Sequence, residues 1–431
     1  MIWKNIEAEK LQIQVVDAQN RMLGAEHLDT VTAMENLAVT YCHLKKYKEA
    51  EKLQIQVVDA RNRILGAEHP GTIRAMRNLA VTYCDLEKYT EAEKMQIQVV
   101  DARNRILGPE HPDTVVAMAN LAVTYYHLEK YMEAEKMQIQ VVDARNRILG
   151  AEHQDTIMAM VNLALTYHHL EKYPEAEKLQ IQVVDVRERI LGAEHPGTIR
   201  AMRNLAVTYC DLEKYIQAEK MQIQVVDARN RILGPEHPDT VAAMANLAST
   251  YYNLEKYTEA EKLQIQVVDA QTRILGPEHI DTVAAMANLA LIYYKLEKYT
   301  EAEKLEIQVV DARNRILGPE HPDTVAAMAD LAVMYCDLKK YTEAEKLQIQ
   351  VVDVRNRILR AGHPHTIMAM RKLAATFESM GKYTQQEQLE TQVLNAENRV
   401  SGEKHQANLR TMVSPPAGNV MNDRYNHKKG N

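Results

Sequence analysis

The segment LGPEHPDT, residues Leu107–Thr114, decides the fold because versions of it recur at a constant interval. They begin every 42 residues, at Leu23, Leu65, Leu107, Leu149, Leu191, Leu233, Leu275, Leu317 and Leu359. A fixed period of this length is typical of a solenoid or a propeller. The apolar pattern that follows each copy of this marker distinguishes the two architectures.

Each marker is followed by two segments with helical periodicity. In the first repeat, one face holds Val31, Met34, Leu37, Ala38, Tyr41 and Leu44. This spacing indicates an α-helix and not a strand. We expect a helix A over about Thr30–Leu44 and, after a break at residues 45–47, a helix B over about Lys48–Leu65. Because helix B is apolar on two sides, it must pack on its own helix A and on a neighbouring repeat.

The predicted helices carry residues that begin and end helices. A threonine precedes helix A in all nine repeats, from Thr30 to Thr366, and its hydroxyl can cap the first-turn amides. Glycine follows helix B in eight of the nine markers, as at Gly66, and can take the left-handed conformation that closes a helix. Prolines that forbid continuation of the helix come directly after four of these glycines, at Pro109, Pro235, Pro277 and Pro319.

These helix pairs resemble a known family. The positions typical of a tetratricopeptide repeat are occupied by Met34, Leu37, Ala38, Tyr41, Tyr47 and Ala50. The repeat length resembles the kinesin-light-chain type, and the marker and helix B resemble the repeat arrays of fungal nucleotide-binding receptors. The resemblance covers about residues 6–413 and implies an all-α, right-handed α-solenoid of tetratricopeptide helix pairs.

Two features depart from that family pattern. Gln54 and its equivalents stand where helix B usually carries an aromatic residue. The receptors' nucleotide-binding domain is absent, since no GxxxxGK[ST] phosphate loop occurs in the sequence.

The repeats also set the expected organisation of the chain. We assign residues 6–22 to a helix B without a helix A before it, and residues 23–400 to nine repeats. A partial tenth repeat should occupy residues 401–413, and residues 414–431 are polar and expected to be disordered. The first helix B would leave one apolar face uncapped, which indicates a chain cut from a longer one or self-association through that helix.

The composition excludes several classes of protein. A formal net charge of −7 argues against a general nucleic-acid binder, which needs basic patches for phosphate. No apolar run reaches the about 18 residues that cross a bilayer. The start, MIWKNIEAEK, has no apolar signal region. We therefore expect a cytoplasmic protein without nucleic-acid or membrane partners.

The residues that often carry chemistry follow the repeat instead of forming one site. Cys42, Cys84, Cys210 and Cys336 occupy one repeat position and are expected to be reduced, structural thiols. One histidine per marker, from His27 to His363, suits hydrogen bonding at a turn better than metal ligation. The motifs HExxH, CxxC, GxSxG and GxGxxG do not occur. We predict no catalytic residues, no metal, no cofactor and no enzyme activity.

The repeats differ mainly on one face of helix A. Counted from Val31 as place one, they vary at places two, five, nine, twelve and thirteen, which lie on one helix face. In tetratricopeptide arrays this face lines the concave groove, so the pattern favours a binding surface. Two basic patches, Arg74 with Arg77 and Arg200 with Arg203, would suit an acidic or phosphorylated segment. Specificity is also assigned to the place-twelve tyrosines, Tyr126, Tyr252 and Tyr294.

Between the variable places, place six is asparagine in seven repeats. The residues are Asn36, Asn78, Asn120, Asn162, Asn204, Asn246 and Asn288, and Asp330 and Lys372 break the series. In similar cargo and chaperone arrays, asparagine here bonds the backbone of an extended peptide, because an amide is both donor and acceptor. The alternative is that these asparagines and arginines are simply solvated on the helix face.

Part of the array is a recent duplication. Residues 66–114 and 192–240 differ only at Thr90/Ile216 and Glu91/Gln217. Near-copies of one pocket suit a repetitive or multivalent ligand.

Three functions remain open. The first is a scaffold that holds a protein or peptide ligand in the groove, as the ligand-sensing arm of an intracellular recognition receptor or as a kinesin-light-chain-like cargo adaptor. A coiled coil that could bind a motor chain would favour the adaptor, and the sequence contains none. The second is a self-associating structural array, and the third is a gene fragment without function.

Overall fold

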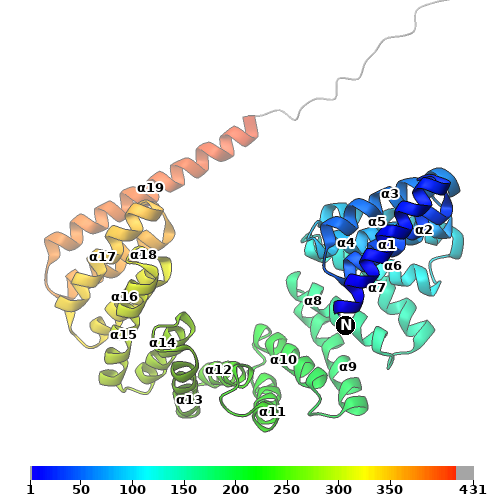
Figure 1. The fold of residues 1–431 in the computed structure, drawn as a ribbon. Coiled ribbons are helices and arrows are strands. Elements are labelled where there is room, and N and C mark those ends of the chain that lie inside the picture. The colour runs from blue at the N-terminus through cyan, green and yellow to red at the C-terminus, as the bar shows by residue number, and fades with distance from the viewer. Residues whose placement is uncertain (1, 414–431) are drawn as a thin grey trace, which may run out of the picture. The chain divides into compact units, whose positions relative to one another are not determined.

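The computed structural model describes the backbone of residues 2–413 and the side chains of residues 7–399. Every regular element in this part of the chain is an α-helix (Figure 1). The tail assigned to residues 414–431 lies outside the described residues. The predicted all-helical solenoid of helix pairs is confirmed.

A short helix A alternates with a longer helix B. The helices A are α2 (Leu28–His43), α4 (Pro70–Asp85), α6 (Pro112–His127), α8 (Gln154–His169), α10 (Pro196–Asp211), α12 (Pro238–Asn253), α14 (Ile280–Lys295), α16 (Pro322–Asp337) and α18 (Pro364–Ser379). The helices B are α1 (Ile2–Leu23), α3 (Tyr47–Leu65), α5 (Tyr89–Leu107), α7 (Tyr131–Leu149), α9 (Tyr173–Leu191), α11 (Tyr215–Leu233), α13 (Tyr257–Leu275), α15 (Tyr299–Leu317), α17 (Tyr341–Leu359) and α19 (Tyr383–Val413).

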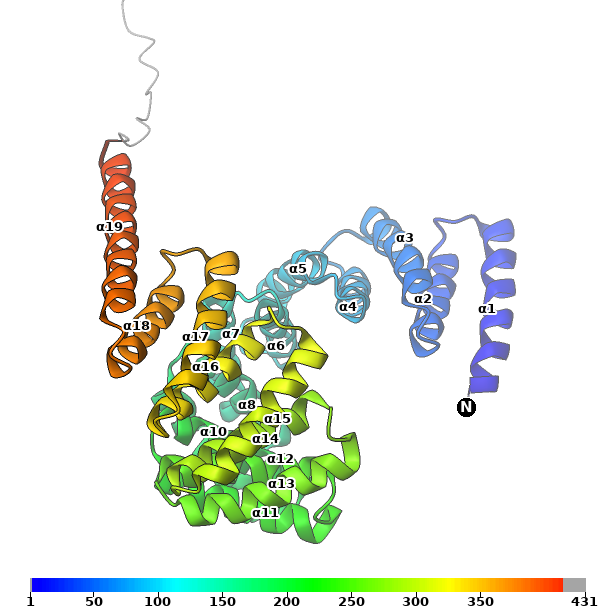
Figure 2. The same cartoon turned by 90° about the vertical axis from the view of Figure 1, so that its left-hand side faces the viewer.

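The chain forms two compact units, one ending at Ala228 and the other beginning at Arg229. In the first unit, consecutive helices from α1 to α10 pack on one another, and in the second the same holds from α12 to α19 (Figures 1 and 2). Helices that are neighbours in sequence are therefore neighbours in space, as a stacked repeat requires.

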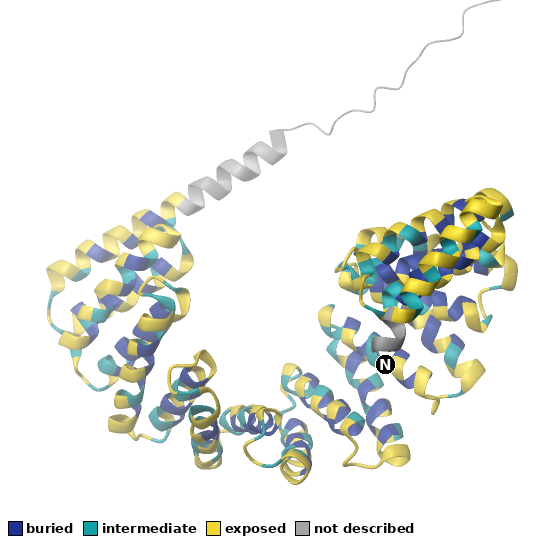
Figure 3. Cartoon of the chain, in the orientation of Figure 1, coloured by how far each residue is buried: buried dark blue, intermediate teal, exposed yellow. Residues whose placement is uncertain are grey.

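The core is continuous from one repeat to the next. One buried cluster joins Val31 of α2, Val57 of α3, Ile73 of α4 and Val99 of α5. Figure 3 shows buried residues along the helix faces that meet neighbouring helices and exposed residues on the opposite faces. Ala50, a small residue of α3, is 0% exposed. A helix B inside the array, such as α3, thus packs on the helix A before it and on the helix A after it, as its two apolar sides predict.

The predicted threonine cap is wrong, because helix A begins two residues earlier than expected. The cap is the marker histidine: His27 Nδ1 accepts a hydrogen bond from the Asp29 amide at 3.2 Å, and all nine marker histidines repeat this contact. Thr30 lies inside the first turn, is 0% exposed, and its hydroxyl has no hydrogen-bond partner. The threonine is therefore a buried packing residue. The expectation that the histidines bond at a turn is confirmed.

The end of helix B needs a positive φ. Gly66 has φ 86° and ψ 162°, so its φ is positive as predicted, although its ψ lies beyond the left-handed helical region. This part of backbone space is nearly restricted to glycine. In the ninth marker the same position is Arg360, with φ 70° and ψ 160°. Arg360 therefore holds a strained backbone that the other repeats assign to glycine.

Two rows of ion pairs join successive repeats. A lysine at the start of helix B pairs with a glutamate of the preceding helix B, as Lys46 Nζ does with Glu9 at 2.7 Å. An arginine near the end of helix B pairs with a marker glutamate, as Arg63 does with Glu26 at 3.0 Å. Ion pairs at the protein surface add little to the free energy of unfolding. Burial of apolar side chains supplies most of the stability, and the ion pairs connect equivalent positions of successive repeats.

The first and last helices, α1 and α19, extend beyond the bounds predicted for them. Helix α1 stands where a helix B without a helix A was expected, although it begins at Ile2. Helix α19 runs from Tyr383 to Val413, through residues 401–413 that were assigned to a partial tenth repeat.

Replacing Arg360 by glycine should stabilise the second unit by about 1–3 kcal/mol, the cost of a strained backbone conformation. The reciprocal variant, Gly318→Arg, should destabilise it by a similar amount, since no atom lies within 4 Å of a Cβ added at Gly318 and only the backbone is strained. Amide hydrogen exchange in α15–α18 measures both. Equal exchange in wild type and Arg360→Gly would contradict the assignment of strain.

Candidate functional site

The variable places form an accessible face, as predicted. Side chains at places two, five, nine, twelve and thirteen are exposed or partly exposed in the nine repeats, except Glu35 at place five, which is 7% exposed. The constant residues of helix A face the core instead, as Leu37 and Ala38 do. The face therefore separates residues that vary from residues that hold the fold.

The place-six asparagines lie on this face. Asn120, Asn246 and Asn288 are exposed, and Asn78, Asn162 and Asn204 are partly exposed. None of their amide groups makes a hydrogen bond within the described residues, so each keeps a donor and an acceptor for a ligand.

Two of the hollows in the first unit that contain a place-six asparagine lie between successive repeats of the array. The Tyr126 hollow is lined by Tyr126, His127, Gln138, Asn162 and Leu165. The Arg187 hollow is lined by Val161, Leu165, Gln180, Arg187, Arg200 and Asn204. Each hollow lies between successive helices A, and the helix B between them supplies its floor. The predicted places two, five, six, nine and twelve thus meet in these hollows.

The floor residue is the glutamine that departs from the family pattern. Gln138 is 4% exposed and Gln180 is 7% exposed, and the Oε1 atoms of both are buried without a hydrogen-bond partner. A buried, unsatisfied acceptor costs free energy unless a donor reaches it. In other repeats the amide nitrogen bonds a place-twelve cysteine, as Gln54 Nε2 does with Cys42 Sγ at 3.8 Å. The four cysteines are free, as predicted.

At one point in the array, the glutamine of a helix B and the asparagine of the next helix A are both replaced by acids. Glu306 stands at the glutamine position of α15, and Asp330 at the asparagine position of the following α16. Glu306 is 6% exposed and accepts no hydrogen bond within the described residues. Burial and, to a smaller extent, the nearby Asp330 carboxylate raise the pKa of Glu306 from its ordinary 4.5 to about 7, against the opposing effect of Arg313.

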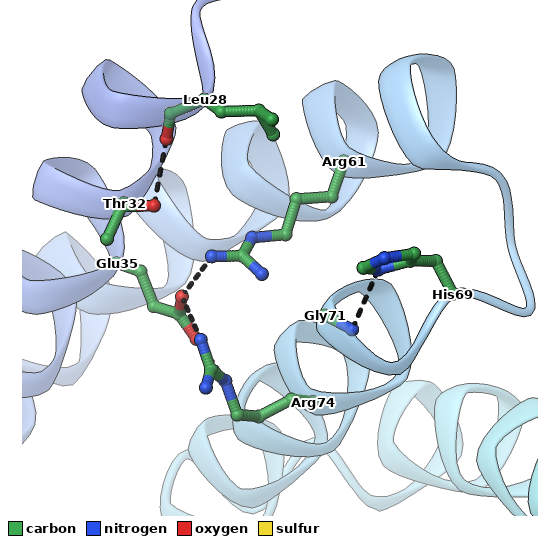
Figure 4. A network of polar contacts seen from close by, with 7 residues as sticks. All are labelled: Leu28, Thr32, Glu35, Arg61, His69, Gly71 and Arg74. Atoms are coloured by element: carbon green, nitrogen blue, oxygen red, sulfur yellow. Dashed lines mark hydrogen bonds and ion pairs between the residues drawn. The ribbon is translucent and has the colours of Figure 1, made fainter.

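The two predicted basic patches are not equivalent. Arg74 donates to Glu35 from Nε at 3.2 Å and from Nη2 at 3.1 Å (Figure 4). Arg61 of α3 donates to the same carboxylate from Nη2 at 2.6 Å. Arg77, Arg200 and Arg203 are exposed and make no hydrogen bond within the described part of the chain.

The place-twelve tyrosines are engaged with neighbouring residues. Tyr126 Oη lies 2.7 Å from His169 Nε2, and Tyr294 donates to Asp337, so place twelve contacts place thirteen of the next repeat. The hydrogen bond to Asp337 is the main reason that the pKa of Tyr294 rises to about 12. The ring of Tyr252 packs edge-on against Tyr257 at 5.4 Å. A ligand would meet tyrosines whose positions are already fixed.

Sequence reasoning missed the residues that helix B contributes to this face. Arg61 of α3 and Arg187 of α9 occupy one repeat position and are buried, but the sequence pattern did not distinguish them from surface arginines. The acidic pair could have been found, since Glu306 and Asp330 each break a repeat pattern and lie 24 residues apart, as Gln180 and Asn204 do. Within the described residues, no helix is long and apolar enough to span a membrane.

The sequence matches the tetratricopeptide repeat family at residues 29–95, 78–147, 117–178, 155–225, 203–255, 240–315, 283–336 and 324–399. A solved Podosopora anserina structure, described as kinesin light chain nearly identical TPR-like repeats, is 29% identical; the match covers 48% of this chain and 99% of that one, with a TM-score of 0.44. No curated protein matches.

Two further solved structures share the fold at low identity. A Signal Transduction ATPase with Numerous Domains protein with a tetratricopeptide repeat sensor, from Pyrococcus horikoshii, is 15% identical over 84% of this chain and 54% of that one, with a TM-score of 0.52. The apo form of the quorum sensor NprR from B. thuringiensis is 15% identical over 85% of this chain and 99% of that one, with a TM-score of 0.50.

Glu306 should make stability depend on pH. Its pKa is higher in the folded protein, so its stabilising contribution is complete below about pH 4.5 and is lost as the pH rises through about 7. Glu306→Gln, which restores the residue of other repeats, should remove this dependence and stabilise the second unit by about 3 kcal/mol at pH 8. Urea unfolding from pH 5 to 8 tests this, and parallel pH profiles of the two proteins would contradict it.

Glu35→Gln should destabilise the first unit by about 3 kcal/mol, because it leaves the buried Arg61 guanidinium without its partner charge. The matched control is Glu26→Gln, which breaks the exposed pair with Arg63 and should change stability little. Amide hydrogen exchange in α2–α4 reports both effects. Similar protection in the two variants would show that the buried pair contributes no more than the exposed one.

Proposed function

The chain belongs to the tetratricopeptide repeat family, whose arrays generally mediate protein–protein interaction, and we propose that it is a scaffold that holds an extended peptide or partner surface on the variable face of its helices A. The observation that carries the proposal is the row of accessible place-six asparagines, whose amides make no hydrogen bond within the described residues. An unpaired amide can bond any peptide group, whatever its side chain.

The neighbours of these asparagines support recognition of a specific sequence. The floor glutamine offers a second, buried acceptor, and the surrounding places differ in charge and size from repeat to repeat. Backbone bonds would supply affinity that is common to all repeats, and the variable places would select side chains. Such a division is typical of extended-peptide recognition.

Within this class, we propose the ligand-sensing arm of an intracellular recognition receptor. The similar fold of a protein whose repeats are described as a sensor supports this choice. The rival is a cargo adaptor of the kinesin-light-chain kind, and the identity of captured partners separates the two. We place the protein in the cytoplasm and propose no catalytic role.

The test is capture from native lysate with two baits, one intact and one carrying alanine at Asn120, Asn162, Asn246 and Asn288. Specific partners should bind the intact array and lose at least about tenfold in recovery with the alanine bait, since four amides at about 1 kcal/mol each are removed. Circular dichroism first establishes that the alanine bait is as helical as the intact one.

A matched control carries alanine at four exposed asparagines near the ends of helices B: Asn62, Asn104, Asn146 and Asn314. This bait should recover the same partners as the intact array. If the bait with alanine at the place-six asparagines also recovers all of these partners, the assignment of peptide binding to this face is wrong.

A second candidate function is self-association through α1, and one observation favours it. Val15 of α1 is 47% exposed, whereas the equivalent Val57 of α3 is 1% exposed, because no helix A of the described chain covers that side of α1. Val15→Glu should then lower the apparent mass in sedimentation at high protein concentration. An identical mass in both proteins at all concentrations would exclude this contact.

A further inference from the structure

The first repeat shows how this fold binds a carboxylate. The Glu35 carboxylate lies between Arg61, on helix B of its own repeat, and Arg74, on helix A of the next one (Figure 4). Both guanidinium groups reach it within hydrogen-bond distance, and its side chain is only 9% exposed. A carboxylate held between two arginines is a strong, charge-assisted arrangement.

Three repeats later the same two arginines recur without the carboxylate. Arg187 and Arg200 are the equivalents of Arg61 and Arg74, and α10 has the same sequence as α4. The equivalent of Glu35, however, is Val161. The arginines are thus retained on a matching frame, while their internal partner is replaced by an apolar residue.

Arg187 is buried and pairs with no acidic side chain among the described residues. It is 4% exposed, Nη1 donates to the Gly197 carbonyl at 2.8 Å, and Nη2 faces only Met158 Sδ at 3.7 Å. The equivalent Nη2 of Arg61 is the atom that donates to Glu35. Burial lowers the pKa of Arg187, and the charge of Arg200 lowers it further. A buried cation without a counter-ion is costly, so the site favours an anion.

These arginines line the Arg187 hollow described above, with Val161 on its wall. The free space is about 20 Å³, room for about one or two waters and close to the size of a carboxylate. Gln180 Oε1 is buried in the same hollow without a donor, and Asn204 lies at its edge. The hollow thus combines cationic donors for a carboxylate with an acceptor for an adjacent N–H group.

We propose that the Arg187 hollow binds the side-chain carboxylate of a glutamate or aspartate in an extended peptide, which takes the place that Glu35 holds in the first repeat. The inference rests on the proposed function and narrows its ligand to an acidic peptide. Val161 leaves the site open for an external ligand, and Glu35 closes the matching site from within. The two sites are an open and a self-filled version of one pocket.

The probe is N-acetyl-Gly-Glu-Gly-amide, titrated into the full chain with ¹⁵N-labelled arginine side chains. The Arg187 and Arg200 Nε–H resonances should shift and saturate, while those of Arg61 and Arg74 should not respond. The glutamine tripeptide should bind at least tenfold more weakly, because it lacks the charge. A phosphoserine tripeptide that binds more tightly than the glutamate peptide would overturn the choice of a carboxylate.

Two reciprocal variants test the equivalence of the sites. Val161→Glu should fill the hollow from within and weaken the tripeptide at least tenfold, with no loss of helical signal. Glu35→Val should make the Arg61 and Arg74 resonances respond to the same probe. Unchanged binding to Val161→Glu, or no saturable shift at Arg187 in the wild type, overturns the proposal, and neither result depends on Glu35→Val being folded.

Capture from lysate separates this inference from the proposed function. If Val161→Glu keeps the partners that the asparagine-to-alanine bait loses, the scaffold stands and the carboxylate pocket is wrong. If the asparagine bait keeps every partner while the tripeptide still shifts Arg187, the pocket stands and the peptide-binding row of asparagines is wrong.

Discussion

Burial of the inner helices B between two helices A is the constraint on which the rest of the structure depends. The residues that accomplish it are small or compact: Val57 of α3 packs in one cluster with Val31 before it and Ile73 after it, and Ala50 is fully buried. Because the cluster draws on neighbouring repeats, no single repeat can bury its apolar surface alone. The array therefore tolerates little change in helix B, and the helix A face that takes no part in this burial is free to vary.

The burial of helix B also places several polar residues beneath the variable face, where they are shielded from water. Gln180, Arg187 and Glu306 belong to helix B and are buried beneath the variable face. Charges and amides at such buried positions have larger energetic effects than exposed ones, because leaving them unpaired is costly. The polar groups differ along the array: Arg61 and Arg74 bond to Glu35, Arg187 and Arg200 lie beside Val161, and Glu306 lies near the Asp330 carboxylate. Near-identical repeats can in this way present different chemistry along one surface.

Most of the fold could be read from the sequence because its signals are local and repeated. Period, helical spacing and the glycine after helix B agreed, and the bounds of α2 and α3 differ from expectation by at most two residues. The threonine cap was misplaced because a buried threonine and a capping threonine look alike without the third dimension, whereas His27 is not a usual cap. The extension of α19 was missed for a similar reason, since a weak marker at residues 401–408 still resembles the strong ones.

The sequence by itself determined the architecture and the location of the variable face, since both follow from periodicity along one chain. It also placed the asparagines and the two arginine patches on that face. Only the tertiary structure decided which charges meet, because the three residues come from three helices, and Arg61 and Arg74 lie 26 and 39 residues from Glu35 in the sequence. That contact makes Arg74 a bound residue and its copy Arg200 an open one, although the helices that carry them are identical. The difference between Arg74 and Arg200 arises from the preceding helix A, which carries Glu35 in one case and Val161 in the other. Only the packing of the helices brings that residue within reach of the arginine.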